Sequence, residues 1–111
     1  MSEPEGIKQY EDPFYIGERR DVEDQVMERD SSTFTISTGT FTLYDSGGTA
    51  RIGPITDSDA AFDIDGAYLR YALNGTAGSV SADLHTVEWK YSTSTNHTFV
   101  DKFHLDIRAI P

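Results

Sequence analysis

Two neighbouring stretches decide the fold class: LHTVEWKY (residues 84–91) and FVDKFHLDI (residues 99–107). In both, mostly apolar residues alternate with mostly polar or charged ones, as a strand with one buried face requires. Only a short polar segment separates them. They therefore predict a β-hairpin, and the chain is expected to be antiparallel β.

The same alternation recurs upstream. Phe34 and Ile36 precede a break at residues 37–39, and Phe41 and Leu43 lead into the turn cluster Asp45-Ser46-Gly47-Gly48. A short strand over residues 49–52 is expected to end at Gly53-Pro54. After a polar connection at 55–66, a further strand covers residues 67–73 and ends at Asn74-Gly75.

The segment from Arg19 to Arg29 fits either a helix or a strand, since Val22 and Val26 suit both periods. We favour a strand, because a helix with so few apolar residues would bury little surface. The count is then about seven strands, which predicts an all-β, immunoglobulin-like antiparallel two-sheet sandwich. The expected inner face is Phe34, Ile36, Phe41, Leu43, Leu69, Tyr71, Leu73, Val87, Trp89, Tyr91, Phe103, Leu105 and Ile107.

The length of 111 residues fits one domain with a core of its own. Residues 1–12 are polar and acidic and are expected to form a flexible N-terminal arm, with the sandwich domain over residues 13–111. The N-terminus resembles no signal peptide, and no apolar stretch is long enough for a transmembrane helix.

The charge is strongly negative, with 9 Lys and Arg against 19 Asp and Glu, a formal net charge of −10. Such a surface repels phosphate backbones and anionic lipids, so neither nucleic acid nor a membrane is an expected partner. With no cysteine, the chain has no disulfide, thiolate nucleophile or thiolate metal site.

Catalytic and metal-binding patterns are weak. No G-x-S-x-G elbow is present, and His85, His97 and His104 have no metal-ligand spacing. We expect no enzyme, no catalytic, cofactor-binding or metal-ligating set, and no cofactor. The acidic stretch Asp57–Asp65 leaves calcium open, although an acidic loop whose carboxylates cap turns explains it better. Carbohydrate stacking is a second open alternative, through the aromatic side chains Tyr10, Phe14, Tyr15, Tyr44 and Tyr68.

Three features resemble a known family: the entry YIGERRDV (residues 15–22), the hairpin FTLYDSGG (41–48) and the closing strand VEWKY (87–91). Their order is similar to the immunoglobulin-like N-terminal domain of phage baseplate upper proteins. This resemblance implies a non-catalytic structural or assembly role in a phage or prophage particle, in its tail, baseplate or head-tail region. It also implies other phage structural proteins, or a second copy of the chain, as partners, and a location in a virion assembled in the bacterial cytoplasm.

Overall fold

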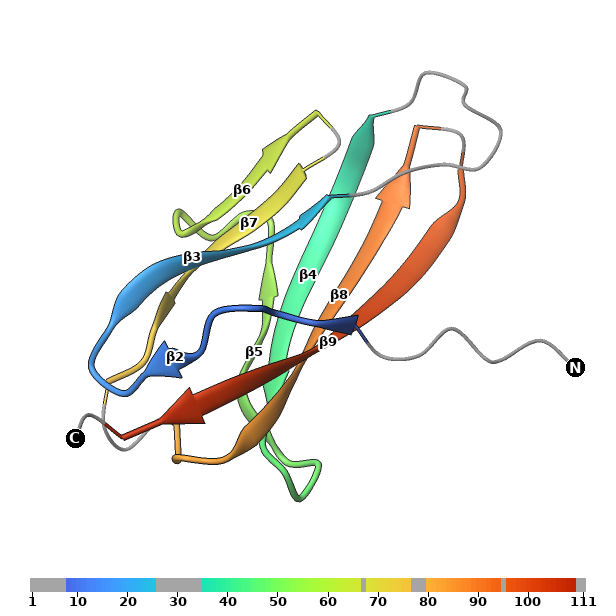
Figure 1. Ribbon diagram of the computed structural model, residues 1–111. Helices are drawn as coiled ribbons and strands as arrows, with labels where there is room; N and C mark the ends of the chain where they lie inside the picture. Colours follow the sequence, from blue (N-terminus) through green and yellow to red (C-terminus); the bar gives the residue numbers. More distant parts are fainter. Residues whose placement is uncertain (1–7, 26–34, 67, 77–79, 95, 110–111) are drawn as a thin grey trace, which may run out of the picture.

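The computed structural model describes residues 8–25, 35–66, 68–76, 80–94 and 96–109. Its described part contains strands and no helix, arranged in two sheets that pack face to face (Figure 1). The all-β two-sheet sandwich expected from the sequence is confirmed. The strands are β1 (Lys8–Gln9), β2 (Phe14–Tyr15), β3 (Arg19–Gln25), β4 (Ile36–Tyr44), β5 (Ala50–Thr56), β6 (Phe62–Asp65), β7 (Tyr68–Asn74), β8 (Leu84–Thr93) and β9 (Thr98–Arg108).

The larger sheet has the order β1-β9-β8-β4-β5, and β2 also pairs with β9; the smaller sheet has the order β3-β7-β6. The predicted hairpin lies in the middle of the larger sheet. Its strands β8 and β9 are antiparallel, and Trp89 lies opposite Asp101. Two short N-terminal strands, β1 and β2, run parallel to β9 along its outer edge. The nine strands differ from the seven expected in two ways. Two expected strands, at residues 34–36 and 41–43, correspond to the single strand β4, and β1, β2 and β6 were not expected, β6 lying in the stretch 55–66 that was taken for a polar connection.

The N-terminal arm differs from its expected form. Lys8 and Gln9 pair with Phe103 and His104 of β9, so the end of that arm belongs to the sheet, whereas residues 1–7 lie outside the described residues. The segment from Arg19 forms a strand up to Gln25, as favoured, and pairs along its length with β7. Residues 26–29 of that segment are not described.

Two expected strand breaks do not occur. Strand β4 continues through Gly39, which packs against the side chains of Leu69 and Phe62 on the smaller sheet. Strand β5 continues through Pro54 to Thr56 at the edge of the larger sheet, where a missing N–H costs no ladder bond. The turn cluster after β4 and the Asn74-Gly75 pair after β7 both end a strand as predicted.

The core lies between the two sheets. Of the expected inner face, Tyr71 and Phe103 are only partly buried, Phe34 is outside the described residues, and the others are buried. Trp89 is fully buried and packs edge-on against Phe41 and Phe62. The sequence did not predict four further apolar core members: Phe14, Val22, Phe62 and Val80.

Candidate functional site

In the acidic stretch 57–65, considered above for calcium binding, two aspartates form ion pairs with the guanidinium group of Arg70. Asp63 and Asp65 lie on β6, and their carboxylates are 3.3 and 3.4 Å from Nη1 of Arg70 on β7. Asp59 accepts a hydrogen bond from the backbone N–H of Ala61 and so caps its turn. Across the described ranges, no three His, Cys, Asp or Glu side chains converge on a possible metal position.

The three histidines lie in separate places. His85 faces the core and is fully buried, with Nδ1 2.9 Å from a carboxylate oxygen of Asp83. His104 lies on the opposite face of the same sheet, beside Tyr44 and Leu84. His97 packs near Phe99 at the end of the β8–β9 hairpin. In the alternation of residues 84–91, His85 falls on the same side as Val87 and Trp89, which the structure confirms, but its full burial was not predicted.

The aromatic side chains considered for carbohydrate stacking do not share one surface. Phe14 is fully buried in the core. Tyr44 lines a groove on the outer face of the larger sheet, whereas Tyr68 packs beside the Arg70 guanidinium on the smaller sheet. Tyr10 lines a cleft between the two sheets.

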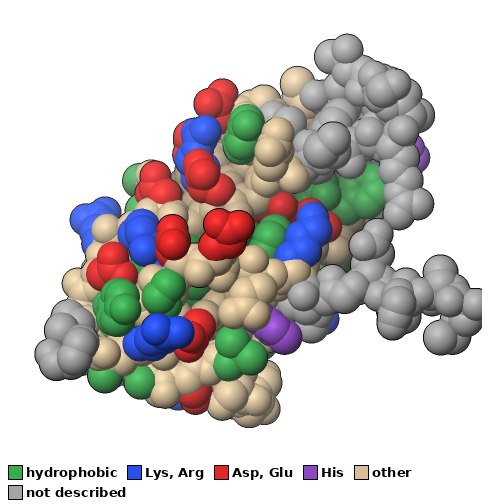
Figure 2. Space-filling model, in the orientation of Figure 1, with side chains coloured by type: hydrophobic (Ala, Val, Ile, Leu, Met, Phe, Trp, Pro, Cys, Tyr) green, Lys and Arg blue, Asp and Glu red, His purple; other side chains and the backbone are tan. Residues whose placement is uncertain are grey.

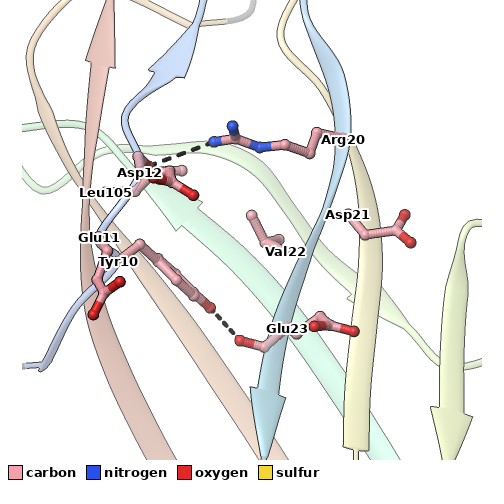
Figure 3. Close-up of a pocket in the computed structure, with 8 residues that line it drawn as sticks. All are labelled: Tyr10, Glu11, Asp12, Arg20, Asp21, Val22, Glu23 and Leu105. Carbon is pink, nitrogen blue, oxygen red and sulfur yellow. Dashed lines mark hydrogen bonds between the residues drawn. The ribbon is translucent and has the colours of Figure 1, made fainter.

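A cleft of about 370 Å³ lies between the two sheets, where the chain following β1 passes β3 (Figure 3). We call it the inter-sheet cleft; it is lined by Tyr10, Glu11, Asp12, Arg20, Asp21, Val22, Glu23 and Leu105. Val22 and Leu105 form an apolar floor, and both are buried. Figure 3 shows Val22 pointing from β3 into the cleft, while Asp21 and Glu23 point to the outer side of that strand.

Two hydrogen-bonded bridges close the ends of the cleft. At one end the Tyr10 hydroxyl donates to the Glu23 carbonyl oxygen, at 2.8 Å. At the other, Arg20 extends from β3 and donates to the carbonyl oxygen of Pro13, at 2.9 Å. It also donates to the carbonyl oxygen of Asp12, at 3.5 Å, the bond drawn in Figure 3. Each bridge joins β3 of the smaller sheet to the chain beside β9 of the larger one. The cleft is therefore short and framed on both sides.

The rim of the cleft is negatively charged. Glu11, Asp12 and Asp21 are exposed, and no ion pair of theirs is found among the described residues. The one cation of the lining, Arg20, is already bound to backbone carbonyls and lies over the Phe14 ring. Figure 2 shows carboxylates spread over the visible face of the molecule, with basic groups between them. The cleft thus combines an apolar floor with two exposed carboxylates at its rim, Glu11 and Asp12, and a third, Asp21, on the outer side of the β3 wall.

A buried carboxyl group, Asp24, lies close to Tyr10 and to the half-buried Asp101. Asp24 of β3 is 1% exposed, and within the described residues neither of its carboxyl oxygens has a hydrogen-bond donor. Burial, together with the neighbouring Asp101 carboxyl of β9, raises the pKa of Asp24 to about 8. Burial also raises the pKa of Tyr10 well above its usual value.

The sequence contained a signal for the burial of Asp24. Asp24 is two residues from Val22, and successive side chains of a strand point to opposite faces, so both share the inner face of β3. Assigning β3 as a strand therefore implied a buried carboxylate. Nothing in the sequence indicated the cleft, because the cleft depends on how the chain after β1 passes β3.

No helix long and apolar enough to span a membrane occurs in the part of the chain that the structure describes.

Comparison with known proteins gives a likeness in fold. No family model matches the sequence, and no curated protein matches it significantly. Among solved structures, the crystal structure of CopC from Methylosinus trichosporium OB3b matches with a TM-score of 0.59 and 9% sequence identity. The match covers 89% of this chain and 86% of the CopC chain. At this identity it shows a shared β-sandwich fold.

The resemblance to phage baseplate proteins is wrong. A solved structure that shares the fold over most of the chain is that of CopC, not of a phage protein, and nothing in the comparisons points to a phage. The implied role in a phage or prophage particle is wrong with it. The three features that carried the resemblance are a strand entry, a glycine turn and an alternating strand, which any antiparallel sandwich requires.

Proposed function

We propose that this chain is a non-catalytic binding domain whose inter-sheet cleft takes a short basic peptide segment with an apolar residue at its centre. The observation that carries the proposal is a set of exposed carboxylates at a cleft with a buried apolar floor: Glu11 and Asp12 at the rim, and Asp21 on the outer side of the β3 wall. Such a rim favours Lys or Arg side chains, and the floor favours an apolar one.

The size of the cleft supports a short segment. Its volume of about 370 Å³ is at the lower end of the range for ligand pockets. The bridges at Tyr10 and Arg20 frame it on both sides, so one apolar side chain fits between them while the flanking residues stay at the rim. Contact with this floor would then bury the apolar side chain of the peptide, since Val22 and Leu105 are already buried.

The charge of the whole chain supports a basic ligand over a second copy of the chain. Each copy carries a formal net charge of −10, so two copies repel each other. A basic segment is attracted over a distance of about a Debye length, roughly 8 Å at physiological ionic strength.

A direct test measures fluorescence anisotropy of labelled Lys-Lys-Leu-Lys-Lys on addition of the protein. We expect saturable binding that weakens as salt is raised. Lys-Lys-Gly-Lys-Lys should bind more weakly because it lacks the apolar anchor, and Glu-Glu-Leu-Glu-Glu should not bind.

Two triple variants separate the cleft from general charge attraction. The rim variant carries Glu11→Gln, Asp12→Asn and Asp21→Asn; the control carries Asp57→Asn, Asp63→Asn and Asp65→Asn, which changes the net charge equally. We expect about a tenfold loss of affinity for the rim variant and at most about twofold for the control, since contact pairs outweigh distant charges. Equal losses in both variants would show that the peptide binds the acidic surface in general and would overturn the proposal.

A further inference from the structure

The Asp24 carboxyl is surrounded by groups from several strands. Asp101 comes from β9, Lys8 from β1, and Tyr10 from the segment that follows β1; Glu23 precedes Asp24 on β3. The burial of Asp24 leaves it almost no contact with water. A carboxylate in such a place needs a donor or a proton.

The neighbouring contacts show that Asp24 needs a proton, because they provide no hydrogen-bond donor to it. Tyr91 of β8 donates a hydrogen bond to Oδ2 of Asp101, at 3.0 Å, which stabilises Asp101 as an acceptor. Asp24 has no donor within the described residues. Two ionised carboxylates cannot hydrogen-bond to each other, because both only accept; one proton turns the repulsion into a hydrogen bond. The nearby Lys8 ammonium favours the ionised form, but burial has the larger effect.

The two carboxyl groups come from different sheets. Asp24 lies on β3 of the smaller sheet and Asp101 on β9 of the larger one. Beside them, the indole N–H of Trp89 donates to the Tyr10 hydroxyl, which in turn donates to the Glu23 carbonyl oxygen. Repulsion between the two carboxylates would therefore act directly across this chain of hydrogen bonds.

We propose that Asp24 and Asp101 share one proton in the folded domain at neutral pH, and that its loss at mildly alkaline pH loosens the contact between the sheets at the Tyr10 bridge. The state of this site is thus set by the binding and release of one proton. The device makes the docking of β3 against β9 pH-sensitive, and it does not depend on the peptide proposed above.

The direct test is a carbon-13 NMR titration of the aspartate carboxyl groups in the unmodified chain from pH 3 to 10. We expect one resonance, assigned to Asp24, to titrate with a midpoint between about 7 and 9, far above the usual value near 3.9. If both Asp24 and Asp101 titrate below pH 5, no proton is shared and the proposal is overturned.

Trp89 supplies a second readout, because it is the single tryptophan of the chain and its N–H bonds to Tyr10. Its fluorescence should change between pH 7 and 9 in the unmodified chain and in Asp21→Asn, a control at an exposed carboxylate of the same strand. In Asp24→Asn the change should disappear, because the amide mimics the protonated acid.

Thermal unfolding then tests the effect on stability. Between pH 6 and 9 we expect the Tm of the unmodified chain to fall by at least about 5 °C, and that of Asp24→Asn to stay within about 2 °C. Parallel pH dependence of the two proteins would contradict the proposal. If Asp24→Asn does not fold, the same Tm comparison is made with Asp101→Asn, and the NMR titration of the unmodified chain tests the shared proton without any substitution.

Discussion

The indole Nε1–H of Trp89 donates a hydrogen bond to the hydroxyl oxygen of Tyr10, at 2.9 Å, across 79 residues of sequence. The same hydroxyl donates to the Glu23 carbonyl oxygen, so one tyrosine connects the centre of the larger sheet to the edge of the smaller one. Tyr10 also stacks on Phe103, with ring centroids 4.5 Å apart. The segment after β1 is thereby fixed, and with it one end of the inter-sheet cleft.

Tyr10→Phe should lower the free energy of unfolding by about 1–3 kcal/mol, because it leaves the buried Trp89 N–H without an acceptor. The aromatic stacking on Phe103 is retained. Urea unfolding followed by Trp89 fluorescence measures the loss. Tyr68→Phe, at a partly exposed tyrosine, is the matched control and should stay within about 0.5 kcal/mol; a similar loss in both variants would exclude the proposed role of the bridge.

Trp89→Ala should cost about 3–5 kcal/mol, since it empties the centre of the core between Phe41 and Phe62. Circular dichroism during urea unfolding measures it, because the fluorescent group is removed. A loss below about 1 kcal/mol would show that Trp89 does not support the core.

Much of this core could be predicted from the sequence, because alternation reports directly which face of a strand is buried. The β8–β9 hairpin and the side of Trp89 follow from it. Phe14 and Phe62 could not be found in this way, since β2 has two residues and β6 four, too few for a period to show.

The sequence also misled where an isolated glycine was taken for a strand break. Gly39 lies inside β4, where an added Cβ would lie 3.0 Å from Leu69 Cδ2 and 3.1 Å from Phe62 Cζ. The glycine permits the close approach of the smaller sheet. Gly39 is needed for a contact between the two sheets, and such a contact cannot be predicted from the neighbouring residues in the sequence.

Gly39→Ala should therefore destabilise the domain, by about 1–3 kcal/mol from overpacking. Gly47→Ala is the control, because its added Cβ would meet Asp45 Oδ1 at an ordinary 3.4 Å. Chemical unfolding of both variants gives the comparison. If Gly39→Ala is no less stable than Gly47→Ala, the two sheets do not pack as closely at this point as the structure indicates.

Asp45→Ala should lower the Tm at pH 7, because the Asp45 carboxylate accepts hydrogen bonds from the backbone N–H groups of Thr49 and Gly47. These bonds hold the pKa of Asp45 below its usual value. A depressed pKa stabilises the folded state above the unfolded pKa, and this contribution is lost as the pH falls through the folded pKa.

The difference in Tm between Asp45→Ala and the unmodified chain should accordingly shrink between pH 5 and pH 2. Thermal unfolding at several pH values measures it, with Asp57→Ala as the control at an exposed carboxylate. A difference that stays constant over this range would show that the charge of Asp45 does not stabilise the turn.

The candidate site was less predictable than the core. The acidic composition indicated what the surface repels, and it pointed to the loop at Asp57–Asp65, whose Asp63 and Asp65 the structure pairs with Arg70. The cleft arises where residues 10–12 pass β3, a meeting of segments on different sheets. No local pattern encodes such a crossing.

The most direct test of the central claim is a nitrogen-15 NMR titration of the chain with Lys-Lys-Leu-Lys-Lys. The proposed function predicts saturable shifts concentrated at the backbone amides of Glu11, Asp21, Val22 and Leu105, the rim and floor of the inter-sheet cleft. Shifts spread over the acidic surface, including Asp63 and Asp65 of β6, or no shifts at millimolar peptide, would contradict it.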